Sequence, residues 1–198
     1  MSKRWVFFSI AFAVACQQKE NGPPAPPMPL TQKASAPALQ TLSGFQTPES
    51  VLYDKDDDIY LVSNINGNPT EADDNGFISR VNPDTKQIDL KWIDAAKPDI
   101  LLNAPKGMAI LNGVLYVADL TVVRKFDMKS GATKGEVAIP GSTFLNDVAT
   151  DGTSIYVTDS GMKAGANGLE GTGTDAVWKI TNDKPVKIAS GTDLDRPN

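Results

Sequence analysis

Histidine is absent from the 198-residue chain, and cysteine occurs once. Without histidine, the chain alone cannot assemble a Ser-His-Asp or Cys-His catalytic group or an imidazole-zinc site. A single cysteine cannot form an internal disulfide. Basic clusters are also missing, and the formal net charge is −5, which makes nucleic acid a poor candidate partner. The sequence therefore directs attention to oxygen ligands and to binding.

A hydrophobic run long enough to span a bilayer is missing as well. The N-terminal apolar stretch covers only residues 5–15 and follows Lys3 and Arg4, a pattern typical of a secretory signal. The letters "AVAC" then place small residues directly before Cys16. This resembles the lipobox of bacterial lipoproteins, which implies that residues 1–15 are removed and that Cys16 is lipidated. The alternative is an ordinary signal peptide with a free cysteine.

Bulky apolar residues are scarce in residues 16–43, which contain six prolines. Such a segment buries too little surface to offset its ordering entropy, so we predict a disordered tether. The lipid would hold the following domain at a membrane. Gln17 after Cys16 implies, by the same resemblance, an outer-membrane location facing the periplasm. Removal of residues 1–15 takes away Lys3 and Arg4 and changes the net charge from −5 to −7.

From residue 44 onward the chain contains an internal repeat and no convincing amphipathic helix. Three segments align, and each has a short apolar strand, a polar tight turn and a second strand that contains a tyrosine. The aligned segments are residues 47–64, 104–119 and 144–159. The alignment makes Tyr60, Tyr116 and Tyr156 equivalent.

Each copy continues with two more strands that alternate between apolar and polar residues. They cover residues 76–83 and 87–93, residues 121–127 and 135–140, and residues 176–181 and 185–190. Tandem four-stranded units predict an all-β β-propeller, with blades at about 45–95, 100–140 and 144–190. A β-sandwich is the alternative, but it does not explain the repeat. The glycine-rich residues 165–175 predict a flexible loop.

Three blades do not close a ring, because propellers have about four to eight. Residues 195–198 read as the start of a fourth copy, in which Pro197-Asn198 matches Pro48-Glu49. We therefore expect residues 44–198 to be the N-terminal part of a six-bladed propeller. The alternative is a complete small protein whose three units pair with another chain.

In a propeller the first strand of each blade lines the central channel, so residues that open these strands should converge at one mouth. The opening positions are held by Glu49, Lys106, Asn146 and Asn198. The loop between the second and third strands opens on the same face. The polar residues of these loops are therefore further candidate mouth residues, namely Asn64, Asn66, Asp119, Asp159 and Ser160.

A carboxylate and amide oxygens that converge on an axis suit a hard cation. Glu49 and Asn146 are the candidate metal ligands, and Ca²⁺ fits them better than Mg²⁺ or Zn²⁺. Such an ion would polarise a carbonyl and activate water without any histidine. The alternative is that these residues only cap turns, which asparagine and aspartate favour on local grounds.

The motifs "TPESVLYD", "FLNDVATDG" and "RPN" resemble the gluconolactonase and regucalcin-like (senescence-marker protein) family of six-bladed propellers. The resemblance covers residues 45–198 and suggests an exported bacterial branch. It implies that Glu49 and Asn146 ligate a divalent metal and that a later aspartate ligand lies beyond Asn198. Lys106 departs from this pattern, because a cation there repels a metal and instead holds an anionic substrate or intermediate.

Two functions follow from these expectations. The first is a metal-dependent hydrolase of sugar lactones, anchored to a membrane by its lipid. The second is a non-catalytic propeller that uses the same mouth to hold a peptide, a glycan or a partner protein in the periplasm or at the cell surface. The catalytic residues themselves are not identified by the sequence.

Overall fold

The computed structural model describes residues 40–198, which form an all-β structure. Within this range the only helix is a short 3-10 turn, η1 (Thr192–Leu194), so no helix of the described residues is suited to cross a bilayer. The predicted signal, Cys16 and nearly all of the predicted tether lie outside the described residues.

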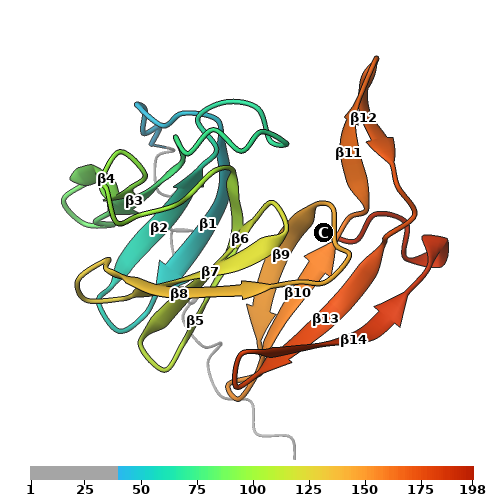
Figure 1. Ribbon diagram of the computed structural model, residues 1–198. Helices are drawn as coiled ribbons and strands as arrows, with labels where there is room; N and C mark the ends of the chain where they lie inside the picture. The colour runs from blue at the N-terminus through green and yellow to red at the C-terminus, as the bar shows by residue number, and fades with distance from the viewer. Residues whose placement is uncertain (1–39) are drawn as a thin grey trace, which may run out of the picture. The chain divides into compact units, whose positions relative to one another are not determined.

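Twelve of the strands form three four-stranded antiparallel sheets (Figure 1). The first sheet has the order β1 (Pro48–Asp54), β2 (Ile59–Asn64), β3 (Phe77–Val81), β4 (Ile88–Asp94). The second has the order β5 (Pro105–Leu111), β6 (Val114–Asp119), β7 (Val122–Asp127), β8 (Thr133–Ala138). The third has the order β9 (Leu145–Thr150), β10 (Ile155–Asp159), β13 (Ala176–Thr181), β14 (Lys184–Ser190). The predicted strands of all three units are therefore present.

A further hairpin lies in the connection between β10 and β13, where a flexible loop was predicted. Strand β11 (Met162–Gly165) pairs with β12 (Gly168–Gly171) between β10 and β13. The residues of this segment do not alternate between apolar and polar, so the sequence pattern did not indicate strands. Backbone pairing and the positive φ of Gly168 form the hairpin. The loop prediction for this segment was wrong in part.

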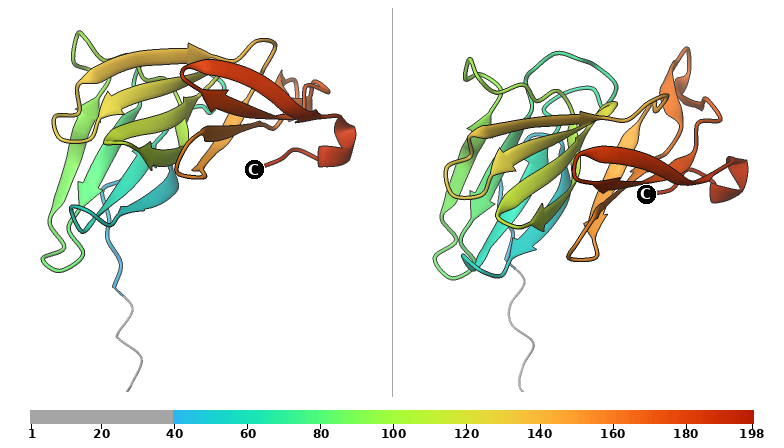
Figure 2. Two further views of the ribbon diagram at one scale, coloured as in Figure 1. Left: turned by 90° about the horizontal axis from the view of Figure 1, so that it is seen from below. Right: turned by 60° about the horizontal axis from the view of Figure 1, so that its bottom comes forward.

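The three sheets pack face to face, with the second between the other two (Figure 2). One apolar core joins the first and second sheets around Leu61, Leu115 and Phe126. Another joins the second and third sheets around Val123 and Ile155. The first strand of each sheet is an edge strand, and β5 lies beside both β1 and β9. We call β1, β5 and β9 the inner strands.

Each inner strand carries the same β-bulge near its start. The pairing of β1 with β2 shifts between Pro48 and Val51, and that of β5 with β6 shifts between Pro105 and Met108. The pairing of β9 with β10 shifts over the corresponding residues 145–148. A bulge places one extra residue opposite the partner strand and redirects side chains. The repeat is therefore structural as well as sequential.

The strand registers correct one part of the sequence alignment. Counted from the bulge, Tyr60 is equivalent to Leu115 and Ile155, whereas Tyr116 and Tyr156 are equivalent to Leu61. The alignment of the three tyrosines is therefore displaced by one residue in the first sheet. Because a shift of one residue moves a strand side chain to the opposite face, Tyr60 faces away from the second sheet.

Candidate functional site

The three inner strands place Glu49, Lys106 and Asn146 at equivalent positions, each as the second residue of its strand and within the bulge. We call the end of the sheets where the inner strands begin the mouth. Because β5 lies beside β1 and β9, these three residues lie at one end of neighbouring strands. That their side chains share one site stays a prediction.

The bulges leave backbone N–H groups outside the strand pairing, and hydroxyl groups of the neighbouring strand accept them. Ser50 donates its backbone N–H to the Ser63 hydroxyl at 3.0 Å, and Asp147 does the same to Thr158 at 2.9 Å. The second sheet has Gly107 at this position. A Cβ on Gly107 would lie 2.0 Å from Oδ1 of Asp147 and 2.5 Å from its Cα. Glycine therefore allows β5 and β9 to approach closely at the mouth.

Asn146 has its side-chain amide fixed by a second residue. The Ser160 hydroxyl donates to the carbonyl of Pro197 at 2.7 Å, so its oxygen accepts the Asn146 Nδ2–H at 3.0 Å. A carbonyl accepts only, which sets the direction of the whole chain of bonds. The Asn146 amide must therefore turn its nitrogen to Ser160, and its oxygen Oδ1 has no hydrogen bond within residues 40–198.

Glu49 is exposed, but nearby protein atoms remove part of the water around its carboxyl group. This desolvation raises the pKa of Glu49, while the Lys106 ammonium lowers it and the Asp147 carboxylate raises it. The influence of Lys106 and Asp147 indicates that side chains from all three inner strands act on one another electrostatically. A cation beside Glu49 would relieve the desolvation and the repulsion by Asp147.

Lys106 is the one predicted site residue of the inner strands that is fully buried, at 1% exposure. Its ammonium donates to the carbonyls of Ala104 at 3.0 Å and Pro69 at 3.2 Å, and it lies 4.4 Å from the centre of the Phe144 ring. Burial lowers the pKa of Lys106 to about 8, against the opposing effects of Asp119 and Glu49. Lys106 thus connects the β2–β3 loop to the mouth. Its ammonium is buried, whereas the sequence analysis expected it to hold an anionic substrate or intermediate.

The other predicted mouth residues have a different role. Asn64, Asp119 and Asp159 end the second strand of each sheet and are buried. We call them the clamp residues, because each accepts backbone N–H groups from the segment that leads into the inner strand. Asn64 accepts from Gln46 at 3.0 Å.

Each of the two acidic clamp residues accepts two N–H groups from the segment that leads into its inner strand. Asp119 accepts from Asn103 at 3.1 Å and Ala104 at 2.8 Å, and it forms an ion pair with Arg124 at 2.9 Å. Asp159 accepts from Phe144 at 2.9 Å and Thr143 at 3.2 Å. The oxygens of the clamp residues are thus occupied by backbone N–H groups, and the place of these residues at the mouth stays a prediction.

Asn198 is exposed and directly follows Pro197, whose carbonyl binds Ser160. The structure therefore brings the Pro197-Asn198 peptide to the Asn146 side of the mouth. Sequence reasoning placed Ser160 in a loop at the mouth but did not predict that it orients the Asn146 amide.

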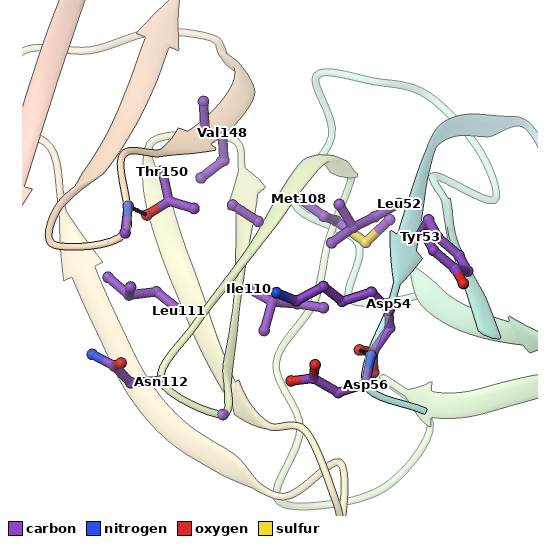
Figure 3. Close-up of a pocket in the computed structure, with 15 residues that line it drawn as sticks. Leu52, Tyr53, Asp54, Asp56, Met108, Ile110, Leu111, Asn112, Val148 and Thr150 are labelled. Carbon is purple, nitrogen blue, oxygen red and sulfur yellow. Dashed lines mark hydrogen bonds between the residues drawn. The ribbon is translucent and has the colours of Figure 1, made fainter. Parts of the chain in front are cut away.

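A cavity of about 590 Å³ lies between the inner strands at the end away from the mouth (Figure 3). Its apolar lining comes from Leu52, Met108, Ile110 and Val148, and Asp54 lies at its edge. None of the predicted site residues lines it. Across residues 40–198, no group of three or more Asp, Glu, His or Cys side chains is close enough to hold a metal ion. A cation at the mouth would thus need amide oxygens as well as carboxylates.

No family model and no curated protein matches the chain. Among solved structures, it resembles a chain of a nidogen/laminin complex, with a TM-score of 0.52 and 14% identity over 73% of this chain and 49% of that one. The extracellular domain of a one-component system from B. thetaiotaomicron has a TM-score of 0.43 and 15% identity, over 72% of this chain and 16% of that one. The chain thus spans half or less of these proteins. The first likeness and the four-stranded sheets fit a β-propeller-like fold.

Proposed function

We propose that the chain provides three blades of a six-bladed propeller whose mouth binds a divalent cation, with Ca²⁺ as the favoured ion, and hydrolyses a sugar lactone. The observation that carries this proposal is the unpartnered Oδ1 of Asn146, held at the same strand position as the Glu49 carboxylate. Both groups are oxygen donors, the class that Ca²⁺ prefers. Any remaining ligands would be water or further protein oxygens.

The surroundings of these two oxygens support a cation more than an anion. Asp147 adds negative charge next to Asn146, and the Lys106 ammonium is already bound to two carbonyls. When bound, a divalent cation supplies polarisation of the substrate carbonyl and a more acidic water. Glu49 and Asn146 would both ligate the cation, while Ser160 fixes the orientation of the Asn146 amide.

Calcium binding and lactone opening can be measured separately on the purified chain. We expect calorimetric Ca²⁺ binding that is lost in Glu49→Gln and Asn146→Ala, together with opening of at least one sugar lactone that chelator abolishes. Glu170→Gln is the matched control, since Glu170 is exposed on the β11–β12 hairpin. Activity that resists chelator, or no activity over a broad lactone panel, contradicts the hydrolase proposal.

A non-catalytic binding function is the second candidate, and the burial of Lys106 favours it. The β2–β3 loop contacts Lys106 through the Pro69 carbonyl, so the buried Lys106 ammonium is not exposed to hold an anionic intermediate. In this case the mouth would hold a peptide, a glycan or a protein with Ca²⁺ as a structural ion. Calcium binding without turnover of any lactone would support this candidate.

We also propose that the chain is exported and anchored to the bacterial outer membrane through Cys16, on the periplasmic side. The support is the "AVAC" pattern after a basic and apolar start. Mass spectrometry of the mature protein from a bacterial host should show acyl chains on an N-terminal Cys16. An unmodified N-terminus, or a retained Cys16 thiol, contradicts the anchor.

A further inference from the structure

The cavity at the end of the sheets away from the mouth has no role in the proposed function (Figure 3). Its volume of about 590 Å³ lies within the range of about 300–1,000 Å³ that is usual for pockets that hold small organic ligands. All three sheets line it, through the ends of the inner strands and the turns that follow them. The cavity is therefore formed within residues 40–198.

Five apolar side chains contribute most of the hydrophobic lining. Met108 and Val148 are buried, whereas Leu52, Ile110 and Leu111 are only half-buried. The half-buried side chains pack against the two apolar cores and also line the cavity. A ligand with an apolar body would remove this remaining surface from water, which favours binding.

Asp54 adds a buried carboxylate to the lining, at 6% exposure. Its Oδ1 accepts the backbone N–H of Asp56 at 3.0 Å, and its Oδ2 has no hydrogen bond within residues 40–198. Oδ2 is nevertheless not sealed from solvent, so it borders accessible space. Buried carboxylates are usually paired. In the part of the chain that the structure describes, no basic side chain lies within ion-pair distance of Asp54.

The fold does not require a carboxylate at the position of Asp54. Counted from the bulge, Asp54 is equivalent to Leu111 of the second sheet, which lines the same cavity with an apolar side chain. The hydrogen bond to Asp56 closes the β1–β2 turn, and an asparagine would make it equally well. The negative charge of Asp54 is thus available to a ligand.

The other charges around the cavity favour a cationic ligand over an anionic one. Asp56 is a second lining carboxylate, and among the described residues Lys55 is the one basic residue of the lining. Lys55 is exposed, so water solvates its ammonium. Arg80 is near enough to interact electrostatically with Asp54, but its guanidinium lies 3.5 Å from the centre of the Trp92 ring.

We propose that this cavity binds a small organic cation, whose N–H groups donate to the Asp54 carboxylate and whose apolar body lies against Ile110 and Leu111. Figure 3 shows Asp54 and Asp56 on the β1 side of the cavity and Leu111 across from them. One orientation of such a ligand would therefore satisfy both its charged head and its apolar body. The cavity shares no lining residue with the mouth, so the proposal is independent of calcium binding and lactone opening.

Octylammonium, octanoate and octanol test the proposal, because they share one alkyl chain and differ in the charge of the head group. Calorimetry and ligand-observed NMR on the purified chain give the three dissociation constants. Octylammonium should bind about tenfold or more tightly than octanoate, because only the cation makes a charge-assisted hydrogen bond to Asp54. Chelator and the Glu49→Gln substitution should leave the affinity for octylammonium unchanged, which separates this site from the mouth.

Asp54→Asn should weaken octylammonium binding by about tenfold and leave octanol binding unchanged, since asparagine keeps the turn hydrogen bond without the charge. Asp58→Asn is the matched control. Asp58 lies in the same turn and accepts from the Tyr53 hydroxyl, but it does not line the cavity. Leu111→Trp should weaken the binding of all three probes, because the larger side chain occupies the cavity. Circular dichroism of each variant verifies folding.

Three results would overturn the proposal. The first is octanoate binding as tight as that of octylammonium, and the second is no binding of octylammonium at millimolar concentration. The third is an Asp58→Asn variant that weakens octylammonium binding as much as Asp54→Asn does. The comparison of the probes on the wild-type chain needs no variant, so it decides the question even where a substitution prevents folding.

Discussion

The Asn146 amide donates to the Ser160 hydroxyl at 3.0 Å, and Ser160 in turn donates to the Pro197 carbonyl at 2.7 Å. This relay decides which end of the amide faces the mouth. A ligand to a metal is usually oriented by a partner of this kind, and loss of the partner weakens metal binding.

Ser160→Ala should therefore lower the affinity for Ca²⁺ by about 10- to 100-fold, because the Asn146 amide is then free to present its nitrogen. Titration calorimetry of the purified variant measures the change. Ser190→Ala, at the exposed end of β14, removes a hydroxyl without touching the relay. An affinity equal to that of the wild type would show that Ser160 does not orient a ligand.

Gly107→Ala should destabilise the protein by about 1–3 kcal/mol or more, because the added Cβ would overlap the backbone and side chain of Asp147. Urea unfolding followed by tryptophan fluorescence gives the free energy of unfolding. Gly171→Ala is the control, since a Cβ at Gly171 meets no atom within 4 Å. Similar stabilities of the two variants would contradict the close approach of β5 and β9.

Asp159→Asn should be tolerated better than Asp159→Ala. Asn64 shows that an amide oxygen can serve as a clamp residue, so the asparagine variant keeps an acceptor for the Phe144 N–H. We expect a loss of about 1 kcal/mol for asparagine and about 3 kcal/mol for alanine, which leaves buried N–H groups unpaired. Urea unfolding distinguishes the two, and equal losses would argue against the clamp.

The stability of the protein should depend on pH through Lys106. Its pKa is about 8 in the folded state and 10.5 as the ordinary value, so the unfolded chain binds more protons between these pH values. The free energy of unfolding should therefore rise from pH 8 to pH 10.5 relative to Lys106→Met, by roughly 3 kcal/mol at most. Below pH 8 the difference between the two proteins should be constant.

Denaturation at several pH values measures this difference, and Lys163→Met is the matched comparison because Lys163 is exposed. A difference that falls with pH, or stays level from pH 8 to pH 10.5, would contradict the burial of a lysine with a lowered pKa. Wild type and Lys163→Met should remain parallel throughout.

The strands were predictable because each sheet buries apolar side chains at a period of two. The bulges were not, since a bulge changes the pairing by one residue without a change in composition. This is why Tyr60 was aligned with Tyr116, although the strand registers make Tyr60 equivalent to Leu115. The β11–β12 hairpin was missed because its pairing depends on the backbone more than on side-chain pattern.

The candidate site was predictable in part for a related reason. Repeat position alone brought Glu49, Lys106 and Asn146 to the same end of neighbouring strands. Repeat position did not reveal which polar side chains are already hydrogen-bonded to backbone N–H groups. Asp119 and Asp159 are of a residue type that ligates metals. Their burial and their hydrogen bonds to the backbone N–H groups of Ala104 and Phe144 are properties of the folded chain.

The bulge at the start of each inner strand has an evolutionary consequence. In the first and third sheets, hydroxyls and clamp residues satisfy the backbone there, so Glu49 and Asn146 can be exchanged without disturbing their sheets. Glutamate, lysine and asparagine already occupy this position in the three sheets of one molecule. Descendants of such a protein can therefore acquire new ligand preferences by substituting one blade at a time.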